Sequence, residues 1–209
     1  MRILVASILA IFTLVGTAQA ADEIEIEGLY RTITPQPTAD PDKIEVLEVF
    51  WYRCPHCFAF KPYIDKYEQS KPDDVYLKRM PAVLRDNWIP QAKIFYLAET
   101  LGVLERLHGA VYTAIHKDKR SLSSRSNIKA FFVENGVDGD EFDAAFDSFA
   151  LDAQVRQANA QTRYYGVTGT PTIIINGRYR TSGALAGSYD AVMTVIDVLV
   201  EKERKRMQK

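Results

Sequence analysis

The sequence predicts an α/β fold in which one sheet is interrupted by an all-helical block, and two observations predict it. Strand-like segments occur before residue 86 and again from residue 172. Between them, apolar residues recur at helical spacing. The chain has 209 residues, of which 47% are hydrophobic and 25% charged, as is typical of a globular protein. Its formal net charge of −1 argues against a nucleic-acid-binding protein.

The first twenty residues have the pattern of a secretory signal peptide. Arg2 supplies a positive start, Ile3–Val15 is almost wholly apolar, and Ala18-Gln19-Ala20 fits a small-x-small cleavage site. The alternative is a membrane anchor, but an anchor needs about 20 apolar residues and this run is shorter. We therefore expect cleavage after Ala20 and export to an oxidising compartment.

The segments that follow read in order as strand, strand, helix and strand. Glu23–Thr34 is expected to contain an edge strand. Lys43–Tyr52 has apolar residues at both odd and even positions, so we expect a strand that is buried on both faces. Phe58–Gln69 has helical spacing, and Val75–Met80 reads as another strand.

Five helical segments are then expected, and together they predict an inserted helical domain over residues 86–159. The segments are Trp88–Thr100, Val103–Lys117, Ser124–Val133, Asp140–Ala150 and Leu151–Tyr165. After them, Thr172–Ile175 and Arg178–Thr181 flank Asn176-Gly177, which is a strong hairpin signal. A last amphipathic helix is expected over Ser188–Met207.

The two cysteines of the chain form a Cys54-Pro55-His56-Cys57 motif between a buried strand and a helix. Cys54 would lie at the helix N-terminus, where free N–H groups and the helix dipole stabilise a thiolate. A protonated His56 would add positive charge, and Pro55 suits the first helical turn. We therefore predict a reactive Cys54 of lowered pKa and a shielded Cys57 that resolves its mixed disulfides.

Two other interpretations of the cysteine pair are weaker. A purely structural disulfide would close a very small loop and stabilise the fold little. A zinc site needs four ligands, and His108 and His116 lie outside the usual ligand spacing, so they are expected to pack or face solvent. No metal or cofactor is expected.

A second candidate element is the Thr170-Pro171 bond, which precedes a strand and is expected to be cis. The sheet would place it beside Cys54, where the backbone of Thr170 is suited to pair with an extended substrate peptide.

Taken together, the strand–CPHC–helix unit, the late Gly-Thr-Pro-Thr, the helical insertion and the signal peptide resemble the DsbA-type periplasmic thiol:disulfide oxidoreductases. The resemblance implies a thioredoxin fold, formed by residues 21–85 and 160–209, with residues 86–159 inserted. It implies that Cys54 attacks, that Cys57 resolves, and that Pro55 and His56 tune the site.

The resemblance also assigns Pro171 to the cis-proline position and Thr170 to the variable residue before it. Glu48 matches a buried acid implicated in proton movement near the second cysteine. The residues agree, because Glu48 lies in an apolar strand where burial raises the pKa of a carboxyl. The alternative is an acid at a strand end paired with a nearby base. By the resemblance, Arg79 falls near a position where the family often has a lysine facing that acid.

The implied activity is the donation of the Cys54–Cys57 disulfide to newly exported proteins that carry free thiols. Reoxidation by a DsbB-like inner-membrane quinone reductase, a periplasmic location and a monomeric state are implied with it. Two alternatives stay open: a thiol reductase or disulfide isomerase on the same fold, and a binding module or chaperone that needs no redox chemistry.

Overall fold

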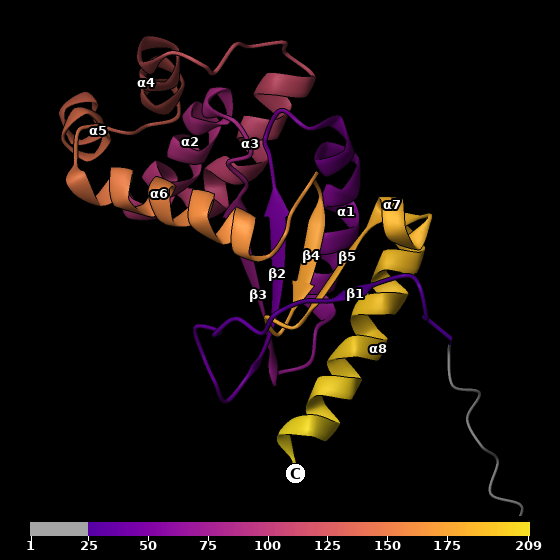
Figure 1. Cartoon of the computed structure of the whole chain (residues 1–209). Coiled ribbons are helices and arrows are strands. Elements are labelled where there is room, and N and C mark those ends of the chain that lie inside the picture. The colour runs from indigo at the N-terminus through magenta and orange to yellow at the C-terminus, as the bar shows by residue number, and fades with distance from the viewer. Residues whose placement is uncertain (1–24) are drawn as a thin grey trace, which may run out of the picture.

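The computed structural model describes residues 25–209 and shows a sheet of five strands in the order β1-β5-β4-β2-β3, with helices around it (Figure 1). The predicted signal sequence, residues 1–20, lies outside the described residues. The strands are β1 (Arg31–Thr32), β2 (Ile44–Phe50), β3 (Val75–Pro81), β4 (Thr172–Ile175) and β5 (Tyr179–Ser182).

β2 organises the sheet, since it pairs in parallel with β3 and antiparallel with β4. All seven of its residues are buried, as the apolar pattern on both parities predicts. The predicted first strand does lie at the edge of the sheet, but of its described residues, 25–34, only Arg31–Thr32 pair with β5.

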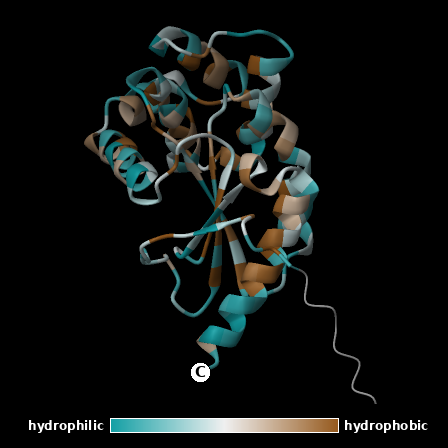
Figure 2. Cartoon of the chain, turned by 45° about the vertical axis from the view of Figure 1, so that its right-hand side comes forward, coloured by the Kyte–Doolittle hydropathy of each residue, from teal (hydrophilic) through white to brown (hydrophobic). Residues whose placement is uncertain are grey.

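Helices cover both faces of the sheet. On one face, α1 (Pro55–Ser70) and α8 (Tyr189–Met207) enclose a core that includes Val46 and Ile173. On the other, α6 (Phe149–Tyr164) crosses the sheet in Figure 1, and its Val155 packs in one cluster with Leu47. Figure 2 shows the same arrangement as brown, hydrophobic strands surrounded by helices with teal outer surfaces.

The helical block lies between β3 and β4 in the sequence, and the core that it forms also includes Phe50, Tyr52 and both cysteines. Its elements are η1 (Asp86–Trp88), α2 (Ile89–Thr100), α3 (Leu104–His116), α4 (Arg125–Glu134), α5 (Gly139–Phe146) and α6. The predicted boundary at Ala150 is wrong, because Ser148 caps α6 by accepting a hydrogen bond from the backbone N–H of Leu151. The short α7 (Gly183–Ala186) was not expected from the sequence.

The helical block also contacts the end of β2 through a stacked pair of tryptophans. Trp51, just after β2, stacks on Trp88 of η1 with ring centroids 4.0 Å apart and planes inclined by 2°. Its indole N–H donates to Gln91 on α2 over 3.2 Å. Within residues 25–209, no helix is both long and apolar enough to cross a bilayer.

The predicted Asn176-Gly177 hairpin connects β4 to β5, and both turn residues have left-handed backbone conformations, with φ of 47° and 63°. A primed turn requires positive φ at both positions. The turn also supports the segment before β2, because the backbone N–H of Gln36 donates to the carbonyl of Gly177 over 3.0 Å.

We predict that Gly177→Ala destabilises the protein by more than about 2 kcal/mol, because a Cβ there would lie 2.2 Å from the carbonyl oxygen of Gln36. Gly102→Ala is the matched control, since Gly102 has a similar φ of 67° but nothing within 4 Å of the added carbon. Urea unfolding of both variants measures the difference. Equal losses of stability would show that the contact with Gln36 carries no cost.

Candidate active site

Cys54 occupies the N-cap of α1, where its backbone is extended, with φ −79° and ψ 117°. A tight turn after β2 delivers it there, because the backbone N–H of Cys54 donates to the carbonyl of Trp51 over 2.9 Å. Pro55 begins the helix, and the missing N–H of a proline is not needed in the first turn. The sequence prediction that the motif opens a helix is therefore confirmed.

The two thiols differ in exposure and are both reduced in this structure. Cys54 is 7% exposed, whereas Cys57 is fully buried. The Thr170–Pro171 bond is cis, as expected, and the carbonyl oxygen of Thr170 accepts a hydrogen bond from the Cys54 thiol over 3.2 Å. The fold thus brings the motif after β2 and the loop before β4 into direct contact.

Hydrogen bonds at the helix start lower the pKa of Cys54 from 9.0 to about 5. The hydrogen bond from the Cys57 thiol lowers the pKa most, and burial opposes it. Hydrogen bonds with Thr170 and with the backbone N–H groups of Cys57 and His56 lower the pKa further. Burial instead raises the pKa of Cys57 well above its ordinary value. One thiol is therefore ionised near neutral pH while its neighbour stays protonated and donates to it.

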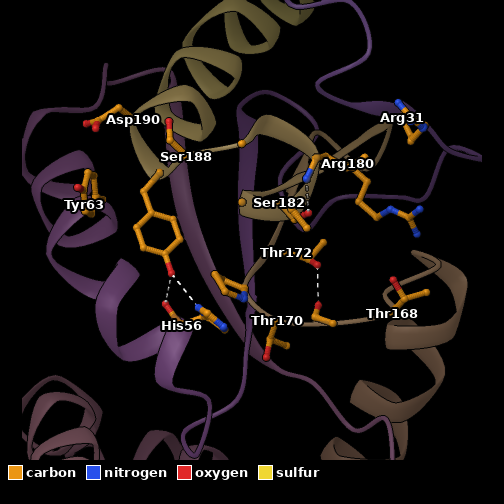
Figure 3. Close-up of a pocket in the computed structure, with 17 residues that line it drawn as sticks. Arg31, His56, Tyr63, Thr168, Thr170, Thr172, Arg180, Ser182, Ser188 and Asp190 are labelled. Carbon is orange, nitrogen blue, oxygen red and sulfur yellow. Dashed lines mark hydrogen bonds between the residues drawn. The ribbon is translucent and has the colours of Figure 1, made fainter.

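His56 is exposed, and its connection to the rest of the fold was not expected. The hydroxyl of Tyr189, at the start of α8, donates to the carbonyl of His56 over 3.1 Å and lies 3.5 Å from its Nδ1 (Figure 3). Residue 56 acts on Cys54 through its backbone N–H. A contribution of the imidazole charge stays a prediction. The sequence offered no signal for Tyr189 beyond its place in the first turn of a helix.

Glu48 lies inside β2, only 2% exposed, directly opposite Arg79 of β3. Its Oε2 is 3.3 Å from Nε of Arg79, although the alignment does not make a hydrogen bond. Burial raises the pKa of Glu48 to about 7, more than the guanidinium lowers it. The sequence left open whether Arg79 faces Glu48, and the register of the two strands shows that it does.

Arg79 connects this buried acid to the surface of α1. Its guanidinium is 2.7 Å from a carboxylate oxygen of Glu68 and 3.4 Å from one of Asp65. Asp65 in turn pairs with Lys61 one turn earlier on α1. Alternating charges therefore extend from the interior of the sheet to solvent.

Two histidines pack beneath the motif, as expected. Nδ1 of His108 lies 2.8 Å from the hydroxyl of Tyr52, and burial lowers the pKa of His108 to about 3, so its ring is neutral. Nε2 of His116 lies 2.8 Å from the carbonyl oxygen of Tyr52. In residues 25–209, no three His, Cys, Asp or Glu side chains are grouped as metal ligands.

A groove of about 960 Å³ lies beside the cysteine motif. Figure 3 shows it extending from Tyr63 and Asp190, on the side of α1 and α8, across the loop that carries Thr170 toward β5 and β1. Its wall carries backbone groups of the loop and apolar surface together. The arrangement is suited to hold an extended polypeptide next to Cys54.

We predict that Glu48→Gln stabilises the protein near pH 8 by up to about 3 kcal/mol and has little effect near pH 4.5. The pKa of Glu48 is higher in the folded state than in the unfolded state. The stability that the neutral carboxyl contributes is therefore fully present below pH 4.5 and is lost as the pH rises through about 7. Urea unfolding at the two pH values measures this dependence.

Glu68→Gln is the control, because it removes an exposed partner of the same arginine and should change the stability by less than about 1 kcal/mol at both pH values. A Glu48→Gln variant that is less stable than the wild type at the higher pH would contradict the assignment of a costly buried carboxylate.

Comparison with known proteins agrees with this geometry. The family model of the DSBA-like thioredoxin domain matches residues 79–192. The thiol:disulfide interchange protein DsbA of Pseudomonas aeruginosa is 36% identical over 209 residues, covering 100% of this chain and 99% of that protein. The Pseudomonas syringae protein of the same name is 40% identical over 189 residues, covering 90% of this chain and 88% of the relative.

Solved structures show the same fold. The crystal structure of Pseudomonas aeruginosa DsbA has a TM-score of 0.83 at 37% identity, over 87% of this chain and 95% of that one. The oxidoreductase DsbA from Xylella fastidiosa has a TM-score of 0.78 at 31% identity, over 84% and 95%. The expected thioredoxin fold with a helical insertion is thus confirmed, and the chain belongs to the DSBA-like thioredoxin domain family of thiol:disulfide oxidoreductases.

Proposed function

We propose that this protein is a dithiol oxidase that donates a Cys54–Cys57 disulfide to newly exported proteins. The observation that carries the proposal is the pair of unlike thiols at the start of α1: Cys54 with a pKa of about 5, and the buried Cys57 with a raised pKa. The names of the relatives, which are thiol:disulfide interchange proteins, support the same activity.

The proposed reaction begins with the oxidised form. A substrate thiolate attacks the sulfur of Cys54, which breaks the Cys54–Cys57 bond, forms a mixed disulfide and releases Cys57 as a thiolate that takes up a proton. A second substrate thiolate then attacks the substrate sulfur of the mixed disulfide, and Cys54 leaves as a thiolate. The substrate loses two electrons, and the protein gains them as one thiolate and one thiol.

A stabilised Cys54 thiolate makes this direction favourable, because it lowers the free energy of the reduced protein. A pKa of about 5 gives two units of stabilisation at pH 7, which is roughly 3 kcal/mol. For a two-electron couple, that free energy raises the reduction potential by about 60 mV. The same pKa makes Cys54 the better leaving group of the two sulfurs.

Reoxidation closes the cycle, and we propose that a DsbB-like membrane quinone reductase accepts the two electrons. We propose a periplasmic location after cleavage at Ala20 and action as a monomer, with Thr170 and Pro171 holding substrate next to Cys54. The signal-like sequence and the contact of Thr170 with the Cys54 thiol support these assignments.

Rival functions differ in measurable ways. A reductase on the same fold would have a Cys54 pKa near or above neutral, because it would lack a stabilised reduced state. A binding module or chaperone would keep its whole activity after Cys54→Ser. The depressed pKa of Cys54 favours the oxidase over the first rival.

We predict that thiolate absorbance of the reduced protein titrates with a pKa of about 5 and that Cys57→Ala raises this value. The alanine removes the thiol that contributes most to the shift. Cys57→Ser is the matched control, because its hydroxyl still donates a hydrogen bond. Equal pKa values for Cys54 in the alanine and serine variants would show that the donor of residue 57 has no part in the stabilisation.

We also predict that the oxidised protein forms disulfides in a reduced, unfolded substrate protein. The Cys57→Ala variant, once joined through Cys54 to a substrate that has a single thiol, should hold the mixed disulfide, because neither Cys57 nor a second substrate thiol is left to break it. Non-reducing electrophoresis and mass spectrometry detect the adduct. An unfolded substrate that stays fully reduced in the presence of stoichiometric oxidised protein would overturn the proposed function.

A further inference from the structure

Two arginines line the end of the groove that is formed by β1 and β5. Arg31 and Arg180 are directly opposite each other in the antiparallel β1–β5 pair, and both contribute to the groove wall. Figure 3 shows them on the side of Thr170 away from Tyr63 and Asp190. Like charges at directly opposed positions of a sheet destabilise the pairing, so this arrangement is one that packing alone does not favour.

Neither arginine has a carboxylate partner within 4.0 Å among the described residues. Arg31 donates to the backbone carbonyls of Gly28 and Tyr30, and Arg180 donates to that of Tyr165 over 3.1 Å. Carbonyl oxygens orient a guanidinium but do not neutralise it. Other arginines of the described chain do form ion pairs with acids, such as Arg79 and Arg204. Two positive charges are therefore left uncompensated next to a groove.

The position of the pair relative to Cys54 follows from the strand register. Thr170 contacts the Cys54 thiol, and Thr172, two residues on, is paired with Ser182 of β5. Arg180 lies two residues further along β5, on the same face as Ser182. At the usual strand rise and spacing, the arginines are roughly 15 Å from the reacting sulfur. An extended peptide covers that distance in roughly four residues.

We propose that Arg31 and Arg180 select substrate segments that carry an acidic residue about four positions from the reacting cysteine. The occupant of the groove is an extended acidic polypeptide, which is attracted by the two guanidinium groups and positioned along β5 and the loop before β4. The inference rests on the proposed dithiol oxidase function and adds a preference among its substrates. A carboxylate is suited to this end of the groove because a planar guanidinium binds it with paired hydrogen bonds.

The experiment compares two synthetic dithiol peptides that differ only in a glutamate or a glutamine about four residues from the cysteine pair. Oxidation by the stoichiometric oxidised protein is stopped with acid and followed by chromatography. We expect the wild type to oxidise the glutamate peptide about five-fold faster, the effect of two partly exposed charge pairs. In about 1 M salt the ratio should fall toward one, because the screening length is then about 3 Å.

The double variant Arg31→Gln and Arg180→Gln should lose the preference. Arg180→Lys keeps the positive charge and a donor for the carbonyl of Tyr165, so it should retain the preference. This variant therefore tests whether a disturbed fold explains the loss in the double variant. Arg156→Gln, on α6 and outside the groove, removes one positive charge elsewhere and should leave the preference unchanged. The reactivity of the protein's disulfide cancels within each ratio. The intrinsic difference between the two peptides is the same for every variant, so it cancels when the ratios of two variants are compared.

Dithiothreitol, which is uncharged and too small to reach the arginines, separates this inference from the function on which it rests. All variants should oxidise it at the wild-type rate. If the wild type oxidises dithiothreitol but oxidises the two peptides at equal rates, the acidic preference is overturned and the proposed function is not. A wild type that oxidises neither dithiothreitol nor either peptide would overturn the proposed function, and the preference with it.

Discussion

The contact between the Cys54 thiol and the carbonyl of Thr170 depends on nearly every other part of the fold. Cys54 follows β2 and Thr170 precedes β4, so the contact requires that these two strands pair across the whole helical block. β2 must therefore be buried on both faces, with α1 and α8 on one and α6 on the other. The insertion is accommodated because both of its ends return to strands that flank β2.

The chemical asymmetry of the motif follows from position within a single helical turn. Cys54 at the N-cap receives hydrogen bonds that stabilise negative charge, whereas Cys57 lies inside the core, where a charge is disfavoured. The buried Glu48 lies in β2, the strand that leads into the motif, opposite Arg79 of β3, so a second titrating group with a pKa near 7 is held in the interior. In the reduced protein, the fold thus combines a Cys54 thiol that ionises near pH 5 with an acid whose charge changes near neutral pH.

Most of the architecture could be predicted from the sequence, because β2, the hairpin and the helix caps are encoded by local patterns. The cis bond and the motif at the helix start were expected for the same reason. The pairing of Arg79 with Glu48 needed the register of β2 and β3, which neither strand specifies alone. Tyr189 and the arginine pair arise from contacts between segments far apart in the sequence, and the boundary at Ser148 was missed because apolar residues continue across it.

The stacked pair of Trp51 and Trp88 contains both tryptophans of the chain. One of these rings is attached to the turn that positions Cys54, since the carbonyl of Trp51 accepts from the Cys54 backbone. The tryptophan fluorescence of the protein therefore comes from one place, next to the cysteines and at the boundary with the helical block. We therefore expect tryptophan emission to respond to changes at the cysteines and in the packing of the block, with no added label.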